Sequence, residues 1–231
     1  MKMKAVTEKT VIYSESPIMT VALKTLCWPD RKKKTEVICV YDPDKLADAL
    51  SCGEIQCVIL DVVAHRHASW LNQIRLYFPA VSLIITQRQV LFSDRVLAEY
   101  LGLTWLRTYD AILAAWPEFR LTDVVNHEIF SGPESGVPQA TERVVMPQQV
   151  FFDAVNKRLR NRLLGIFSGC PVTTVVLDGL IKGVPVNTLG KRIFLSRETV
   201  YQYRKKIIKA LQIEHYSREF MRSLKIDDST Q

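Results

Sequence analysis

Cationic, amide and aromatic side chains gather between residues 196 and 211, near the C-terminal end of the chain. Ser196 begins this segment and favours a helix start, because its hydroxyl can accept a hydrogen bond from a backbone N–H of the first turn. Apolar residues at helical spacing, with Tyr203 or Arg204 among them, predict one inward stripe: Val200, Ile207 and Leu211. The opposite face carries Glu198, Tyr201, Gln202, Lys205 and Lys209. Its cations and amide are suited to contacts with phosphates and base edges.

A shorter helix is predicted immediately before this segment. Gly183 can end the preceding helix in a left-handed conformation, and Pro185 favours a turn. Leu189 and Ile193 then share one face of a helix over 186–193, and residues 194–195 form a tight turn into Ser196. The pattern of short helix, turn and longer basic helix indicates a helix-turn-helix, whose second helix enters the major groove of DNA.

The charge of the chain is concentrated around this motif. The formal net charge is +7, yet residues 147–231 contain 15 Lys and Arg against 7 Asp and Glu, whereas residues 1–146 contain 16 against 17. All of the excess positive charge therefore lies in the part that carries the helix-turn-helix. Such a distribution favours binding to a polyanion.

The last 60 or so residues resemble the DNA-binding domain of LuxR/GerE-type regulators of the NarL/FixJ kind. The resemblance rests on spaced positions: Pro171, Gly183, Leu189, Ser196, Thr199, Val200, Arg204, Ile207, Lys209 and Leu211. The chain departs from that family at Thr173 and Thr174, where a glutamate is usual, and at Tyr203, where a histidine is usual. The resemblance implies an all-α four-helix domain in which the final helix, over 216–224, forms the dimer contact on DNA.

Base edges are expected to meet Tyr201, Gln202 and Lys205, because an amide suits adenine and a lysine suits guanine. The DNA-binding set is completed by the N-cap and by side chains expected mainly at phosphates: Ser196, Arg197, Thr199, Tyr203, Arg204, Lys206 and Lys209.

A second candidate site lies in the N-terminal half. Asp61 follows the continuous apolar run 57–60, which is typical of a buried parallel strand. Strands are predicted at 11–13, 36–40, 57–61, 81–86 and 103–106, with intervening helices at 17–26, 43–52, 69–77 and 93–101, the last capped by Ser93, and a helix over 111–129. This alternation predicts a doubly wound parallel sheet, in which functional groups gather at the carboxyl ends of the strands. Those groups are Glu15, Asp61, Thr86 and Arg107.

Residues 9–130 resemble the receiver domain of two-component response regulators. Asp61 stands where the phosphoacceptor would be, Glu15 is what remains of the usual acidic pair, and Arg107 or Thr108 stands where a lysine is usual. Aspartyl phosphorylation requires carboxylates to hold Mg²⁺ and a cation on the phosphoryl group. The missing acid and lysine favour a degenerate α/β receiver-like domain that serves dimerisation or partner binding. Phosphorylation of Asp61 is the alternative, and Asp61 can also act as a helix cap.

A linker is predicted over 131–147, since two Gly and two Pro fall within eight residues. The helix-turn-helix domain then spans 148–231. It begins with a helix over 148–166 whose basic side chains suit either solvent or DNA: Lys157, Arg158, Arg160 and Arg162.

No cofactor or metal is expected. The cysteines number five, which fits no disulfide framework, and the spacing of Cys52, Cys57, His65 and His67 matches no structural zinc site. No nucleophile and base can be paired at a recognisable spacing, so no catalytic residue and no enzymatic activity is predicted. Without a signal peptide or a long apolar run, the expected location is the cytoplasm, with no membrane contact.

The sequence thus predicts a transcription regulator that binds double-stranded DNA as a homodimer, or as a heterodimer with another LuxR-type regulator, and is independent of phosphorylation. RNA polymerase is a further candidate partner. One alternative is a conventional response regulator phosphorylated on Asp61. The other is an interaction protein that modifies a second response regulator and has weak DNA binding of its own, as in auxiliary regulators that resemble RcsA and BglJ.

Overall fold

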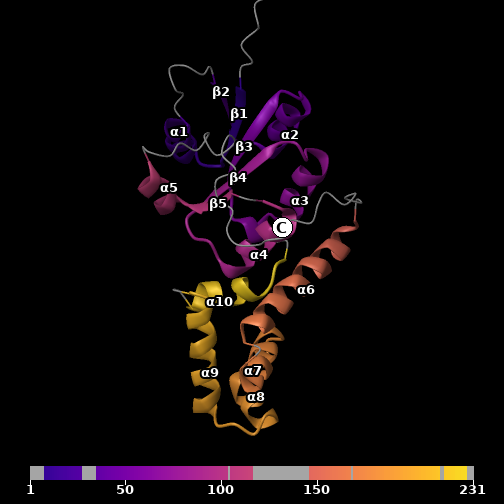
Figure 1. Ribbon diagram of the computed structural model, residues 1–231, viewed down its shortest axis with the longest axis vertical. Helices are drawn as coiled ribbons and strands as arrows, with labels where there is room; N and C mark the ends of the chain where they lie inside the picture. Colours follow the sequence, from indigo (N-terminus) through magenta and orange to yellow (C-terminus); the bar gives the residue numbers. More distant parts are fainter. Residues whose placement is uncertain are drawn as a thin grey trace, which may run out of the picture.

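The computed structural model describes residues 8–27, 35–103, 105–116, 146–167, 169–213 and 216–227. Its N-terminal part is a five-stranded parallel sheet with the order β2-β1-β3-β4-β5 (Figure 1). The strands are β1 (Glu8–Tyr13), β2 (Thr35–Val40), β3 (Ile55–Asp61), β4 (Ser82–Gln87) and β5 (Trp105–Thr108). Chain order reverses beside β1, as in a doubly wound sheet, so the predicted topology is confirmed.

The strands alternate with helices α1 (Pro17–Leu26), α2 (Pro43–Ser51), a 3₁₀ turn (Ala64–Arg66), α3 (Ala68–Tyr77), α4 (Phe92–Leu101) and α5 (Tyr109–Ala115). Two predicted details change. Ser93 does not cap α4, because the helix begins one residue earlier and the carboxylate of Asp94 accepts the N–H of Leu91 instead. Of the helix predicted over 111–129, only the first part falls in the described residues. Of the predicted linker, only the end does.

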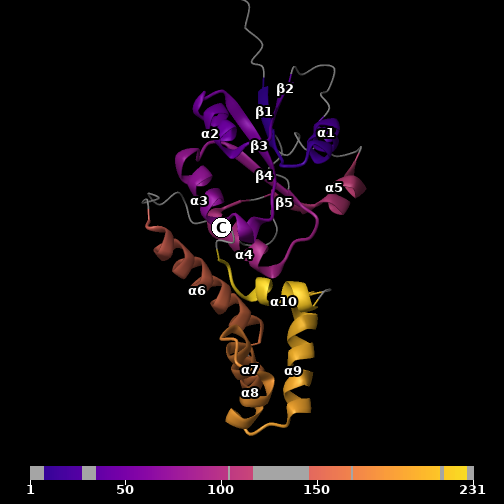
Figure 2. The same ribbon diagram turned by 180° about the vertical axis from the view of Figure 1, so that it is seen from behind.

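The C-terminal part is all α, as predicted. Its helices are α6 (Gln148–Ile166), α7 (Pro171–Ile181), α8 (Val186–Arg192), α9 (Arg197–Ala210) and α10 (Tyr216–Leu224). Helices α7, α8 and α9 pack together, with α9 rising beside α7 (Figure 2). Gly183 has a φ of 70° and ends α7 in the left-handed conformation that the sequence predicts.

The turn between α8 and α9 is held by close backbone packing. The N–H of Leu195 donates to the carbonyl of Gly190 at 3.0 Å. A Cβ added at Gly190 would lie 2.9 Å from the carbonyl oxygen of Leu195, and a backbone atom cannot move away as a side chain can. Glycine is therefore required at this position.

We expect Gly190→Ala to lower the free energy of unfolding by about 1–3 kcal/mol, the usual cost of overpacking. Urea denaturation followed by circular dichroism measures it. The matched control is Gly165→Ala in α6, where an added Cβ meets nothing within 4 Å and alanine should stabilise the helix by up to ~1 kcal/mol. Equal effects of the two substitutions would contradict this explanation of the turn.

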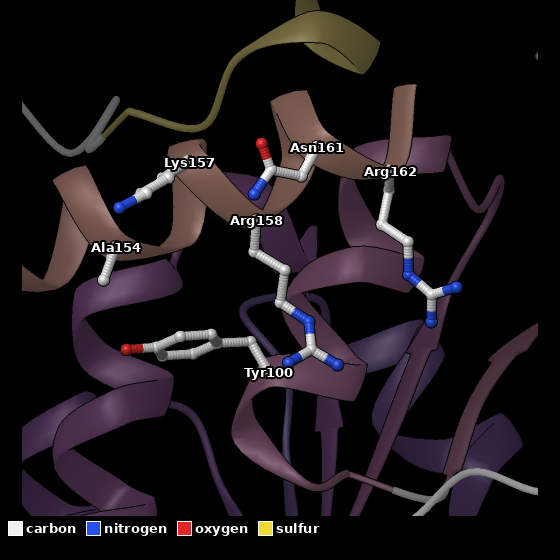
Figure 3. Close-up of a pocket in the computed structure, with 6 residues that line it drawn as sticks. All are labelled: Tyr100, Ala154, Lys157, Arg158, Asn161 and Arg162. Carbon is white, nitrogen blue, oxygen red and sulfur yellow. The ribbon is translucent and has the colours of Figure 1, made fainter. Parts of the chain in front are cut away.

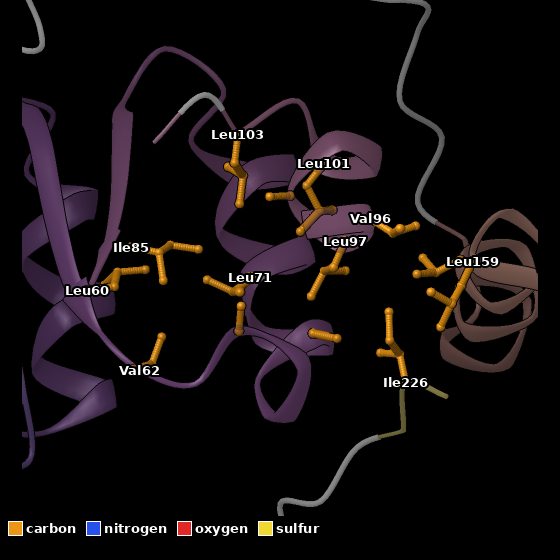
Figure 4. Packing of buried hydrophobic residues seen from close by; sticks show 14 of the residues in the cluster. Leu60, Val62, Leu71, Ile85, Val96, Leu97, Leu101, Leu103, Leu159 and Ile226 are labelled. Atoms are coloured by element: carbon orange, nitrogen blue, oxygen red, sulfur yellow. The ribbon is translucent and has the colours of Figure 1, made fainter. Parts of the chain in front are cut away.

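The two parts of the chain share one hydrophobic core. Helix α4 packs against α6 and α10, and Val96 of α4 faces Leu159 of α6 and Ile226 (Figure 4). Leu159 is fully buried and Ile226 is 1% exposed. The side-chain amide of Asn156 holds the end of the chain by two hydrogen bonds to the backbone of Ile226, at 2.8 and 2.9 Å. Helix α4 is therefore the element of the sheet domain that packs most extensively against the helical domain.

Candidate nucleic-acid interface

Helix α9 is fixed by its N-cap and by its buried stripe. The hydroxyl of Ser196 accepts the N–H of Thr199 at 3.1 Å and lies 3.0 Å from the hydroxyl of Thr199. Val200 and Ile207 are fully buried and Leu211 is 6% exposed, so the predicted inward stripe is confirmed. Tyr203 packs partly against the same core. The opposite face of α9 is consequently turned outward.

Two arginines bracket the ring of Tyr201. The guanidinium carbons of Arg197 and Arg204 lie 5.5 and 5.7 Å from the ring centroid, and Arg197 also donates to the Tyr201 hydroxyl at 3.5 Å. The bond from Arg197 lowers the pKa of Tyr201. Arg204 also lies over the ring of Phe220 in α10, and burial lowers its pKa. Tyr201, which is predicted to contact a base edge, therefore lies between the cationic side chains of Arg197 and Arg204.

Beyond its first turn, α9 exposes one amide and three lysines: Gln202, Lys205, Lys206 and Lys209. Arg197 and Glu198 are exposed in that first turn. Lys206 lies over the ring of Tyr203 at 5.2 Å. Both ribbon views show α9 extending away from the sheet domain (Figures 1 and 2). This donor-rich surface is long enough, at 14 residues, to occupy a major groove.

Basic side chains of α6 pair with carboxylates of neighbouring helices. Arg160 and Lys182 both pair with Asp178 of α7, and Arg158 and Arg162 face Glu99 of α4. Three of the four cations predicted for this face therefore have a carboxylate within the protein. The structure places them at helix–helix contacts rather than on the surface that α9 presents.

The carboxylate of Asp61 is held by two hydroxyls. The hydroxyl of Ser14 donates to Oδ2 at 2.7 Å, and that of Tyr109 donates to Oδ1. Burial, and then the bond to Asp61, raises the pKa of Tyr109, so the phenol stays protonated. Thr86 is fully buried beside Asp61 in the sheet register, as the strand pattern predicts. Glu15, the remaining acid, is exposed.

Neither of the two residues predicted at the lysine position has a hydrogen bond or ion pair with Asp61. Arg107 donates to the carbonyl of Leu106 and lies over the ring of Trp105, and Thr108 caps α5. The position is taken by Tyr109, which the sequence interpretation missed. Its place directly after β5 was the available signal, because the carboxyl ends of parallel strands share one edge of the sheet.

Among the described residues, the hydrogen-bond partners of Asp61 are hydroxyls. In the described part of the chain, no three His, Cys, Asp or Glu side chains lie close enough to hold a metal ion. Each of the two Asp61 oxygens accepts one hydrogen bond from a hydroxyl. These two hydrogen bonds hold the Asp61 carboxylate in place.

A buried polar network beside Asp61 was also missed. Asp94, fully buried, accepts from the backbone N–H of His65 at 2.8 Å and lies 2.7 Å from its Nδ1. Its other oxygen accepts from Gln87 and from the N–H of Leu91, each at 2.8 Å. The network joins the loop that follows Asp61 to the first turn of α4. It thereby fixes the start of α4, the helix that packs against α6 and α10.

No helix in the described ranges is both long and apolar enough to cross a membrane. No family model matches the chain, and no curated protein is significantly similar to it in sequence.

Solved structures are nevertheless similar over nearly the whole length. A structure of the two-component response regulator RcsB in complex with DNA has a TM-score of 0.58 at 15% identity, covering 94% of this chain and 98% of RcsB. A structure of two RcsB dimers bound to two parallel DNAs has a TM-score of 0.53 at 16% identity, with the same coverage. The chain therefore has the fold of a full-length response regulator of the RcsB kind, a receiver-like α/β domain followed by a helix-turn-helix domain.

Proposed function

We propose that this protein is a sequence-specific DNA-binding transcription regulator that acts as a dimer. The observation that carries the proposal is the outward face of α9, where Gln202 and Lys205 are exposed between flanking cations. A capped helix with such a face can donate to base edges from its centre and to phosphates from its margins. The RcsB structures, one titled as a DNA complex and one as dimers on DNA, support the same function for this fold.

In this proposal Gln202 and Lys205 read bases. The phosphate-contacting set is Ser196, Arg197, Thr199, Tyr203, Arg204, Lys206 and Lys209, and Tyr201 serves mainly to hold Arg197 and Arg204 in place. Contacts with phosphates supply affinity without sequence information, whereas the two central side chains supply discrimination.

We expect Lys206→Ala to reduce the salt dependence of DNA binding. Each phosphate contact releases about one counterion, so the slope of log K against log salt should fall in magnitude by ~1. Fluorescence anisotropy of the pure protein with a short duplex at several salt concentrations measures this slope. Lys45→Ala, an exposed lysine of α2 in the sheet domain, is the matched control. An unchanged slope for Lys206→Ala would exclude its phosphate contact.

The proposal includes independence from phosphorylation. Asp61 is engaged by Ser14 and Tyr109, whereas Glu15, the remaining acid of the expected pair, is exposed. The competing function is a response regulator switched by phosphorylation of Asp61, and intact-mass measurement after incubation with acetyl phosphate and Mg²⁺ distinguishes the two.

A second candidate function is that of a subunit that pairs with another LuxR-type regulator. This candidate is favoured by the two hydroxyl hydrogen bonds to Asp61. If the partner responds to the signal, this chain does not need to be phosphorylated. Co-purification with such a regulator, compared with DNA binding by the pure homodimer, separates the candidates. RNA polymerase remains a candidate partner in either case.

A further inference from the structure

A groove between α4 and α6 is rich in hydrogen-bond donors and poor in acceptors. It has a volume of about 450 Å³ and is lined by Tyr100 from α4 and by Ala154, Lys157, Arg158, Asn161 and Arg162 from α6 (Figure 3). This volume lies in the ~300–1,000 Å³ range of small-molecule sites. Three cations line the groove, and Glu99 of α4 pairs with two of them, Arg158 and Arg162. The local charge is therefore positive.

Arg158 provides the most specific observation. Its Nε is buried and has no hydrogen-bond partner among the described residues. Its Nη2 lies 3.7 Å from Glu99 Oε2, which is beyond hydrogen-bond length, whereas Arg162 donates to the same oxygen at 2.6 Å. Buried N–H groups are almost always paired with an acceptor. The guanidinium of Arg158 is thus only loosely paired, through its 3.7 Å approach to Glu99, and it has the fork shape that binds phosphate in a bidentate manner.

We propose that this groove binds a small phosphate-bearing ligand, with phosphoryl oxygens between Arg158 and Arg162. In Figure 3 the guanidinium of Arg158 lies beside the ring of Tyr100, while Lys157 and Asn161 project from the same helix. The ring of Tyr100 packs edge-on against Phe151, with centroids 5.8 Å apart. Glu99 pairs with both arginines, so a bound ligand competes with this carboxylate for them.

This competition gives the site a distinctive signature. Arg158→Gln removes the charged fork and should weaken binding about tenfold or more, the usual contribution of a charge-assisted bidentate contact. Glu99→Gln removes the competing charge and should tighten binding by roughly threefold. The charge-matched control is Lys45→Gln, on an exposed face of α2, which should bind as the wild type does.

The test is calorimetric titration of the full chain with inorganic pyrophosphate and, separately, ATP, after circular dichroism has shown that each variant is folded. Saturable binding that is weakened by Arg158→Gln and tightened by Glu99→Gln supports the site. Binding that is equal in wild type and Arg158→Gln overturns it. Loss of pyrophosphate binding in Lys205→Gln/Lys209→Gln instead would place the anion on α9 and also overturn it. A variant of Arg158 that lowers only the affinity for duplex DNA would assign the groove to DNA and reject the small ligand.

Discussion

The double variant Gln202→Ala/Lys205→Ala will bind its best DNA site at least about thirtyfold more weakly than the wild type. Each bidentate contact to a base edge is worth enough discrimination that losing two gives roughly this factor or more. Both side chains are exposed on α9, whose buried stripe is untouched by the substitutions. The measurement is anisotropy with a duplex enriched from a random pool.

The same variant should keep most of its affinity for random duplex, because it removes only one of the cations of α9. Lys45→Ala is again the control for the loss of one positive charge outside the helical domain. If the double variant loses as much affinity for random DNA as for the enriched site, Gln202 and Lys205 contribute only general attraction, and base reading must be assigned elsewhere.

Asp94→Ala is expected to lower the free energy of unfolding by about 3–5 kcal/mol, the usual result of removing one partner from a buried, hydrogen-bonded charge. The carboxylate satisfies the N–H groups of His65 and Leu91, the His65 ring and the side chain of Gln87. The N–H groups of His65 and Leu91 lose this acceptor at a position that is fully buried, whereas the Gln87 amide keeps its bond to the carbonyl of Gln89. Urea denaturation with a fixed m-value measures the loss.

The matched control for this prediction is Asp48→Ala, an exposed aspartate of α2, where the change should stay within about 0.5 kcal/mol. A loss below about 1 kcal/mol for Asp94→Ala would mean that water or a rearranged His65 replaces the carboxylate at little cost. In that case the network would not be what fixes the first turn of α4.

The strands and the helix-turn-helix were predictable because each depends on local pattern. The apolar run before Asp61 and the inward stripe of α9 both have the period of the element that they form. Gly183 was predictable for a different reason, since a left-handed helix end selects for glycine. These features depend on a few neighbouring residues, so no knowledge of distant contacts was needed.

The contacts made across the sheet edge were not predictable. Tyr109 meets Asp61 from 48 positions away, and Asp94 meets His65 from 29 positions away. Side-chain types alone do not reveal such pairs, because many hydroxyls and carboxylates follow strands in this chain. The two arginines that flank the ring of Tyr201 were not predictable for a similar reason, and its base contact stays a prediction.

The packing of the two domains also exceeded what the sequence could reveal. Val96 and Leu159 each lie on the apolar stripe of an amphipathic helix, and the sequence does not reveal which element covers that stripe. Only the structure shows that α4 supplies that partner, and that the carboxylate of Glu99 engages the basic face of α6. The basic face had two equal interpretations in the sequence, solvent or DNA. Arg160 and Arg162 are exposed in the structure and also pair with protein carboxylates, which the sequence did not reveal.

The most direct test of the central claim is selection of binding sites by the pure protein from a random duplex pool, with and without acetyl phosphate and Mg²⁺. We predict enrichment of the same site under both conditions, with two half-sites about one helical turn apart, as a dimer of helix-turn-helix domains requires. Enrichment only after acetyl phosphate would show that Asp61 is a working switch. No enrichment under either condition would contradict the proposal that this chain recognises DNA by itself.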